Sequence, residues 1–181
     1  MMLDKLLGTS HARAYRFLAQ WPGKGFMESE IVAGTGLSRS AVNLAMRDLA
    51  DAGLITRQAR GRTRFYAADP SDPVVRQFKI WETTFLLAPL LREIQPIVRR
   101  VILFGSAARG ADTPESDIDL FIIGEDRRAI RKVLDAPLDG RRVQAVIVSN
   151  QELSALKRDD PAFYRQVQAG IALYQESGES A

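Results

Sequence analysis

Two aspartates separated by a single residue, Asp117 and Asp119, are the strongest candidates in this sequence for metal chemistry. In an extended strand, residues i and i+2 point to the same side, so both carboxylates would project from one face. Two carboxylates this close repel each other unless a positive charge lies between them. Mg²⁺ supplies such a charge and prefers oxygen ligands. The spacing therefore predicts a Mg²⁺ site on this pair.

A glycine–serine pair, Gly105-Ser106, lies eleven residues before the first of these aspartates. Glycine lets the backbone approach a phosphate closely, and the turn's N–H groups and the serine hydroxyl can donate to it. The pattern predicts a triphosphate, from ATP or another NTP, on the turn beside the metal. A P-loop is excluded because Ala111-Asp112 follows Gly110 where Lys-Ser/Thr is required, and no GxGxxG fingerprint is present.

The run FGSAARGADTPESDIDLFII, residues 104–123, contains the motif GSxARG…SDxDL. This motif resembles the nucleotidyltransferase superfamily that includes DNA polymerase beta, in particular its minimal nucleotidyltransferase branch. The resemblance covers about residues 97–150. It implies nucleotide binding by Gly105, Ser106 and Arg109, and metal binding and catalysis by Asp117 and Asp119. An exposed helical position without a ligand is the alternative for Arg109.

The resemblance also implies a third carboxylate on the next strand, where it would complete the metal site and help to deprotonate the attacking hydroxyl. The matching position here is Gln144, and no Asp or Glu lies between Arg141 and Ser149. A glutamine oxygen is neutral and cannot act as a base, so a two-metal site would lack one of its charged ligands. We therefore expect binding of the nucleotide and Mg²⁺ to survive better than turnover.

Alternating hydrophobic runs and turn residues define the elements that would position this site. Asp139-Gly140 is predicted to form a turn. In the strand that carries the aspartates, Ile118, Leu120 and Ile122 should be buried on the opposite face. The predicted strands are 98–104, 118–123 and 142–148, and the predicted helices are 127–134, 152–156 and 162–174. This order predicts a small mixed sheet with helices.

The N-terminal part of the chain differs in charge from the rest. Residues 1–67 contain ten Lys or Arg and five Asp or Glu, a net charge of +5, whereas residues 68–181 carry a net charge of −2. A basic segment beside a slightly acidic one indicates two separate tasks. The basic segment is the candidate for binding a polyanion.

Local signals in the basic segment predict three helices followed by two short strands. Ser38 is a good N-cap for the third helix, Gly53 should end it, and the strands should flank a turn at residues 60–62. The runs LSRSAVNLAMRDLADAGLITR and GRTRFYA resemble the winged helix-turn-helix domain of bacterial and archaeal transcription regulators. The resemblance covers residues 12–67 and implies a recognition helix at about 38–50 and a wing at 57–65.

Side chains at the start of this helix and around the wing turn could contact double-stranded DNA, because they can donate to phosphates or reach base edges. The candidates are Ser38, Arg39, Ser40, Asn43, Arg60, Arg62 and Arg64. A solvated hairpin without a ligand is the alternative for the three arginines. Winged helices also act as protein–protein modules.

Two prolines and two aspartates in residues 68–73 break the pattern before a predicted helix at about 74–94. Pro89 should kink this helix. One stripe of this helix contains Val74, Phe78, Trp81 and Phe85. This aromatic stripe either packs on the chain's own domains or forms a homodimer interface, as two DNA half-sites would favour.

Composition excludes several classes of site. There is no cysteine and one histidine, His11, so disulfides, thiolate catalysis and multi-histidine metal sites are not supported. We expect no membrane span, no signal peptide and a cytoplasmic location.

The predicted architecture is a two-domain α+β or α/β chain. It comprises a winged helix-turn-helix domain (1–67), a linker with a connecting helix (68–96), and a minimal nucleotidyltransferase-like domain with a small mixed sheet (97–181). The favoured function is a DNA-binding transcription regulator that binds Mg-NTP. The alternatives are an active Mg²⁺-dependent nucleotidyltransferase that transfers NMP to a hydroxyl, and one half of a toxin–antitoxin pair with a small helical partner.

Overall fold

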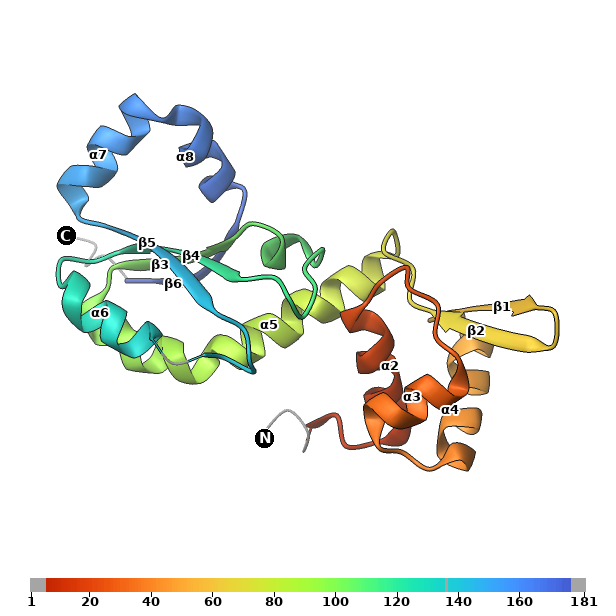
Figure 1. The fold of residues 1–181 in the computed structure, drawn as a ribbon. Coiled ribbons are helices and arrows are strands. Elements are labelled where there is room, and N and C mark those ends of the chain that lie inside the picture. Colours follow the sequence, from red (N-terminus) through yellow and green to blue (C-terminus); the bar gives the residue numbers. More distant parts are fainter. Residues whose placement is uncertain (1–5, 136, 177–181) are drawn as a thin grey trace. The chain divides into compact units, whose positions relative to one another are not determined.

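The computed structural model describes residues 6–135 and 137–176 and has mixed α+β architecture (Figure 1). The chain divides into two compact units, Met1–Lys79 and Ile80–Ala181. Helix α5 (Pro73–Ile94) begins in the first unit and ends in the second. Within the described residues, no helix combines the length and the apolar character that crossing a membrane requires.

The N-terminal unit contains three helices and an antiparallel hairpin, in the order predicted from the sequence. The helices are α2 (Ser10–Gln20), α3 (Glu28–Thr35) and α4 (Arg39–Asp51). The hairpin pairs β1 (Thr56–Arg60) with β2 (Thr63–Ala67). The turn between the strands contains Gly61, which has a φ of +63°, a conformation that glycine adopts without steric cost.

Capping residues and an apolar core explain these helices. Ser38 caps α4, as predicted, because its hydroxyl accepts a hydrogen bond from the backbone N–H of Ala41 (3.2 Å). Gly53 follows α4 with a φ of +74°. The largest fully buried side chains of this unit are Leu18, Ile31 and Met46.

The C-terminal unit is built on a four-stranded sheet in the order β5-β4-β3-β6. Strand β3 (Arg100–Phe104) pairs antiparallel with β4 (Ile118–Ile123) and with β6 (Ile171–Gln175). Strand β5 (Val143–Val148) pairs parallel with β4. The sheet is therefore mixed, as the sequence predicted.

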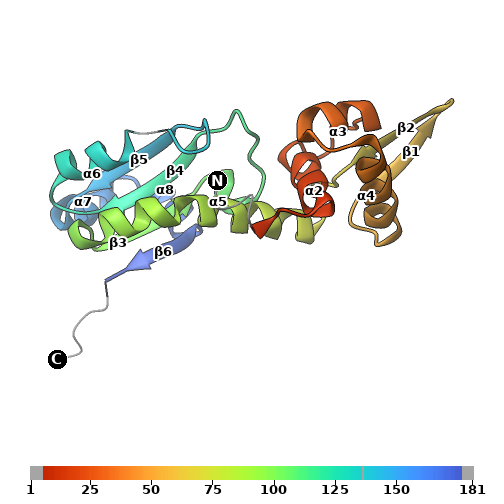
Figure 2. The ribbon, with the colours of Figure 1, turned by 90° about the horizontal axis from the view of Figure 1, so that it is seen from below.

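Helices cover both faces of this sheet (Figures 1 and 2). Helix α6 (Arg127–Leu134) and the C-terminal part of α5 lie on one face, and α7 (Asn150–Asp159) and α8 (Pro161–Gln168) lie on the other. Residues Ile118, Leu120 and Ile122 of β4 are buried on the first face, which confirms their predicted position. Phe121 and Ile123 are buried on the second. Alternate residues of β4 thus serve two separate cores.

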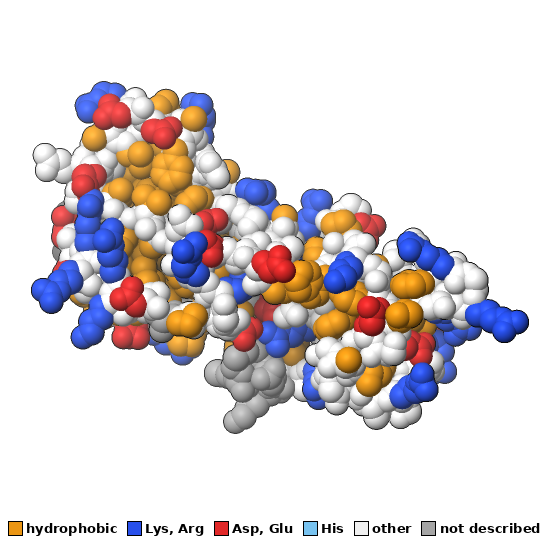
Figure 3. Space-filling model, in the orientation of Figure 1, with side chains coloured by type: hydrophobic (Ala, Val, Ile, Leu, Met, Phe, Trp, Pro, Cys, Tyr) orange, Lys and Arg blue, Asp and Glu red, His pale blue; other side chains and the backbone are white. Residues whose placement is uncertain are grey.

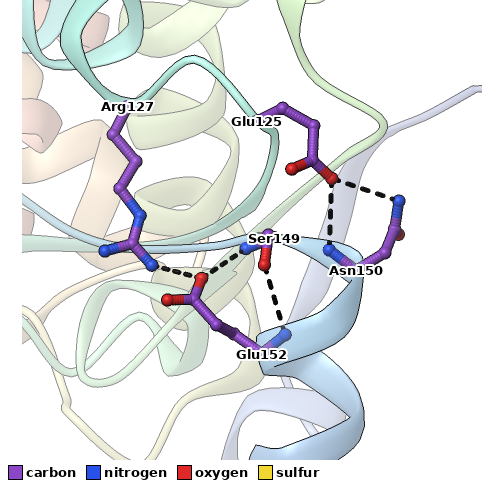
Figure 4. Close-up of polar contacts among 5 residues, drawn as sticks. All are labelled: Glu125, Arg127, Ser149, Asn150 and Glu152. Carbon is purple, nitrogen blue, oxygen red and sulfur yellow. Dashed lines mark hydrogen bonds and ion pairs between the residues drawn. The ribbon is translucent and has the colours of Figure 1, made fainter.

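A polar network fixes the start of α7 at the C-terminal ends of β4 and β5 (Figure 4). The carboxylate of Glu152 accepts from the backbone N–H of Ser149 (2.8 Å), and the Ser149 hydroxyl accepts from the backbone N–H of Glu152 (3.2 Å). Arg127 of α6 donates to the same carboxylate. Asn150 donates to Glu125. This capping box orients α7 on the sheet.

One predicted helix is partly wrong. The sequence indicated a helix over 162–174, whereas α8 ends at Gln168 and residues 171–175 form β6. The reason lies at Gly170, where a Cβ atom would approach the carbonyl oxygen of Leu103 to 2.4 Å. The backbone there passes so close to β3 that the chain leaves the helix and pairs with that strand.

Candidate functional site

The turn after β3 carries the first part of the candidate nucleotide site. Gly105 has a φ of +74°, and a Cβ atom at this position would lie 2.2 Å from Oδ2 of Asp119. Both the backbone conformation and the space therefore require glycine. Asp119 pairs with Phe104 across the antiparallel ladder, which brings its carboxylate over the turn. Ser106, half-buried, follows at the start of a short 3₁₀ helix, η2 (Ala107–Arg109).

The two aspartates lie at the N-terminal end of β4 in different environments. Asp119 is half-buried, and desolvation, together with the charge of Asp117, raises the pKa of its carboxyl group. Arg109 and Arg141 oppose this effect, since their charges favour the ionised form. The two carboxylates thus interact, as predicted, and Arg109 lies within electrostatic range of Asp119.

Asp117 forms an ion pair that the sequence did not reveal. The guanidinium of Arg142 donates from Nη2 to Oδ2 (2.7 Å) and from Nε to Oδ1 (3.3 Å). This hydrogen-bonded fork lowers the pKa of Asp117. The positive charge expected beside the acid pair is therefore supplied, at least in part, by the protein itself.

The neighbouring Arg141 has a different role. Its side chain is about 10% exposed and pairs with the buried Asp112 (Nη1–Oδ2 2.8 Å). Its Nε also donates to the backbone carbonyl of Ser116 (2.9 Å). This buried pair ties the loop before β4 to the segment before β5 and so fixes the backbone that precedes Asp117.

Gln144 lies beside Asp119 on the parallel neighbour strand, because the two residues are Cα partners in the β4–β5 ladder. Partners of this kind share a sheet face, so the amide occupies the position inferred for a third carboxylate. Gln144 is exposed and carries no charge.

These groups do not fit a complete catalytic metal centre. The acid pair contains two carboxylates, one of them paired with Arg142, beside the neutral Gln144. In the part of the chain that the structure describes, no three His, Asp or Glu side chains converge on a point that could hold a metal ion. The Mg²⁺ expected from the sequence therefore stays a prediction.

The candidate DNA-binding side chains of α4 are all exposed. The Ser38 hydroxyl is engaged in the helix cap and lies 3.1 Å from the hydroxyl of Ser40. Asn43 donates to the Glu28 carboxylate of α3 (3.3 Å), which also accepts from the Tyr66 hydroxyl (3.1 Å). Arg39, the first residue of α4, completes this group.

The hairpin does not present its three arginines on one side. In its register Ala59 pairs with Arg64 and Arg60 pairs with Thr63, so Arg60 and Arg64 lie on opposite faces. The Arg60 guanidinium stacks over the ring of Phe65, 5.1 Å from the centroid. Arg62 lies in the turn, and basic side chains, drawn in blue, project at the free end of the hairpin (Figure 3).

Two contributors to this surface were missed from the sequence. Arg57 is the diagonal neighbour of Arg64 on the same hairpin face, a placement that the strand alternation around residues 60–62 could have revealed. Glu28, which holds Asn43, could not have been found, because the contact joins residues fifteen positions apart in two different helices.

Residues 87–167 match the family model of the nucleotidyltransferase domain, a region that covers most of the C-terminal unit. A comparison with curated proteins found no match.

Two solved structures are similar to parts of the chain. One is a protein of Sulfolobus solfataricus proposed to be a nucleotidyltransferase, with 15% identity over 56% of this chain and 87% of that chain and a TM-score of 0.38. The other is TrmBL2, an archaeal chromatin protein with a novel mode of DNA binding. It is 17% identical over 85% of this chain and 70% of that chain, with a TM-score of 0.32. Because both TM-scores lie below 0.5, neither likeness bears on the function of this chain.

Proposed function

We propose that the protein is a DNA-binding transcription regulator whose nucleotidyltransferase-like region binds a nucleotide as a signal. The observation that carries the regulatory role is the exposed N-terminal end of α4 in the same unit as an arginine-bearing hairpin. Three helices followed by such a hairpin fit a winged helix-turn-helix, in which the third helix enters the major groove.

The charges of the N-terminal unit support this role. Arg57 and Arg64 on one hairpin face, with Arg62 at the turn, can neutralise phosphates of the DNA backbone. Arg39 and Asn43 on α4 are candidates to reach base edges. Glu28 keeps the Asn43 amide in a defined orientation, which would favour one base over others. A homodimer on two half-sites would agree with this mode of binding.

Gel-shift titration of the full chain on DNA from upstream of its own gene tests the regulatory role. Wild type should prefer this DNA over a scrambled duplex at physiological salt. Arg62→Ala should weaken binding to both duplexes and reduce the salt slope by about 1, as expected for one lost phosphate contact. Arg92→Ala, at an exposed position of α5 in the other unit, is the matched control. Equal affinity for the two duplexes would refute the regulatory proposal.

The nucleotide part of the proposal rests on the turn at Gly105 and the register of Gln144. The turn places backbone N–H groups and Ser106 at the end of β3, a setting in which a phosphate can be bound. Gln144 cannot take a proton from an attacking hydroxyl. We therefore propose that an NTP binds and is released unchanged.

An active Mg²⁺-dependent nucleotidyltransferase is the second candidate, favoured by the family match over residues 87–167. Labelled ATP incubated with the protein and Mg²⁺ would then release pyrophosphate, and Asp117→Ala would abolish label transfer. The absence of transfer to protein, RNA or small hydroxyl acceptors would exclude this candidate. A small helical toxin partner, the remaining alternative, is tested by co-purification with the product of the adjacent gene.

A further inference from the structure

The contact between Arg142 and Asp117 occupies a special position in the sheet. Each residue immediately precedes its strand, and the strands start in register, since Ile118 and Val143 are Cα partners. Two N–H groups of one guanidinium reach the two oxygens of one carboxylate. The arginine side chain is 77% exposed, whereas that of Asp117 is 31% exposed. The cation thus lies on the solvent side of the acid pair.

Arginine side chains offset part of the negative charge around the acid pair. Asp112 is compensated by the buried Arg141, and Asp117 by Arg142. Asp119 feels the positive charges of Arg109 and Arg141. Arg142 therefore relieves part of the repulsion that was the physical reason to expect a dication, while Asp117 still raises the pKa of Asp119.

A hollow on the outer side of β5 adjoins this ion pair. Arg142 and Gln144 line it together with Arg131 of α6. The remaining lining residues are Leu134, Asp135, Val143 and Ala145. The hollow holds two guanidinium groups, those of Arg131 and Arg142, and the carboxylate of Asp135, and it is not lined by the Gly105 turn or the two aspartates. Arginine has five N–H donors, and the fork to Asp117 uses two nitrogen atoms, so donors remain for a phosphate oxygen.

We propose that Arg142 is the built-in counter-cation of this site and that the site takes its nucleoside triphosphate as the metal-free polyphosphate. The inference rests on the nucleotide binding proposed above and specifies the form of the ligand. Arg142 neutralises the carboxylate that would otherwise repel the phosphates, and its remaining N–H groups donate to them.

Calorimetric titration of the full chain with ATP tests this proposal in two buffers, one with excess Mg²⁺ and one with EDTA. Wild type should bind ATP in EDTA with an affinity within about threefold of that in Mg²⁺. Arg142→Gln should lower the affinity in EDTA by about tenfold or more, as expected for the loss of a charge-assisted hydrogen bond. Arg128→Gln, at an exposed position of α6 outside the lining of the hollow, is the matched control and should change neither value.

Three results would overturn the proposal. Binding that is present in Mg²⁺ and lost in EDTA would show that a metal is required, while the proposed nucleotide function would stand. Unchanged binding by Arg142→Gln in EDTA would show that this arginine is not the counter-cation. No binding in either buffer would remove the nucleotide function itself. Arg142→Lys, which keeps the charge without the fork, should give an intermediate affinity, and circular dichroism checks that each variant is folded.

Discussion

The two ends of the parallel strands β4 and β5 carry arginine–carboxylate contacts of different kinds. At the C-terminal ends, Glu152 accepts from Arg127 while it also belongs to the capping box of α7 (Figure 4). At the N-terminal ends, Asp117 accepts from Arg142 and lies beside a second carboxylate, Asp119. The first contact is part of a helix cap, whereas the second involves an exposed arginine that can also reach a ligand.

The position of the candidate site follows from the strand directions. Ligands of open α/β sheets bind beyond the carboxyl ends of the strands. Here the site lies at the amino ends of β4 and β5, but β3 runs antiparallel to β4 and delivers Gly105 to the same place. The site therefore lies at the carboxyl end of β3, in agreement with the rule. The C-terminal ends of β4 and β5 lie at the start of α7 instead.

The largest expected change in stability distinguishes Arg141 from Arg142, the two consecutive arginines before β5. Arg141→Met leaves Asp112 buried without its ion partner, and we expect a loss of about 3–5 kcal/mol in the free energy of unfolding. Arg142→Met, the matched substitution at the exposed position, should change the stability much less. Urea denaturation of both variants provides the measurement. Equal losses would show that the two contacts are of one kind.

A smaller effect tests the contact between the turn and the acid pair. Gly105→Ala and Gly140→Ala both place a side chain at positive φ, which costs about 1–2 kcal/mol. At Gly105 the new methyl group collides with Asp119, whereas at Gly140 no described atom beyond the glycine and its chain neighbours lies within 4 Å of the new Cβ. The first variant should therefore unfold at lower urea than the second and bind ATP more weakly. Identical midpoints would contradict the close packing at the turn.

At the opposite end of the strands, Ser149→Ala removes the cap of α7 and should cost about 1 kcal/mol. ATP binding should not change, since this end is proposed to be structural. Ser154→Ala, which lies inside α7, is the control for the loss of a hydroxyl. If the Ser149 variant lost ATP affinity, the division of roles between the two ends would be incorrect.

The smallest effect depends on pH. Burial and Asp117 raise the pKa of Asp119, so its ionised form is disfavoured in the folded protein. Asp119→Asn should raise the unfolding temperature at pH 7, and the gain should vanish below about pH 3.9, where Asp119 is protonated in both states. The pKa of Asp117 is lowered by Arg142, so Asp117→Asn should lose stability at pH 7 instead. That loss should disappear as the pH falls through the lowered pKa. Thermal unfolding with the same sign for both variants would contradict these assignments.

The sequence predicted the parts of the fold and site that depend on local spacing. The alternation in β4 follows from the strand period, so the burial of Ile118 could be predicted. The place of Gln144 beside the acid pair was implied by the family resemblance and not by local spacing. The sequence alone could not distinguish the role of Arg141 from that of Arg142. Only the course of the loop before β5 decides that one arginine is buried against Asp112 and the next reaches Asp117.

The remaining differences also have tertiary causes. The segment 171–175 became a strand because Gly170 passes against the backbone of β3, a contact that no local pattern encodes. In the hairpin, the run of arginines suggested a single basic arm. The register instead places Arg60 and Arg64 on opposite faces of the hairpin, and Arg57 lies on the same face as Arg64.

In the proposed function, a nucleotide bound beside Asp119 acts as a signal for DNA binding by the N-terminal unit. Fluorescence anisotropy of labelled upstream DNA, titrated with the full chain in the presence and absence of saturating ATP, tests it most directly. We expect ATP to change the DNA affinity of wild type by about threefold or more, a coupling of at least ~0.7 kcal/mol, and to leave Gly105→Ala unaffected. The same affinity for wild type with and without ATP, in a sample shown by calorimetry to be saturated, would show that the nucleotide is not a signal for DNA binding.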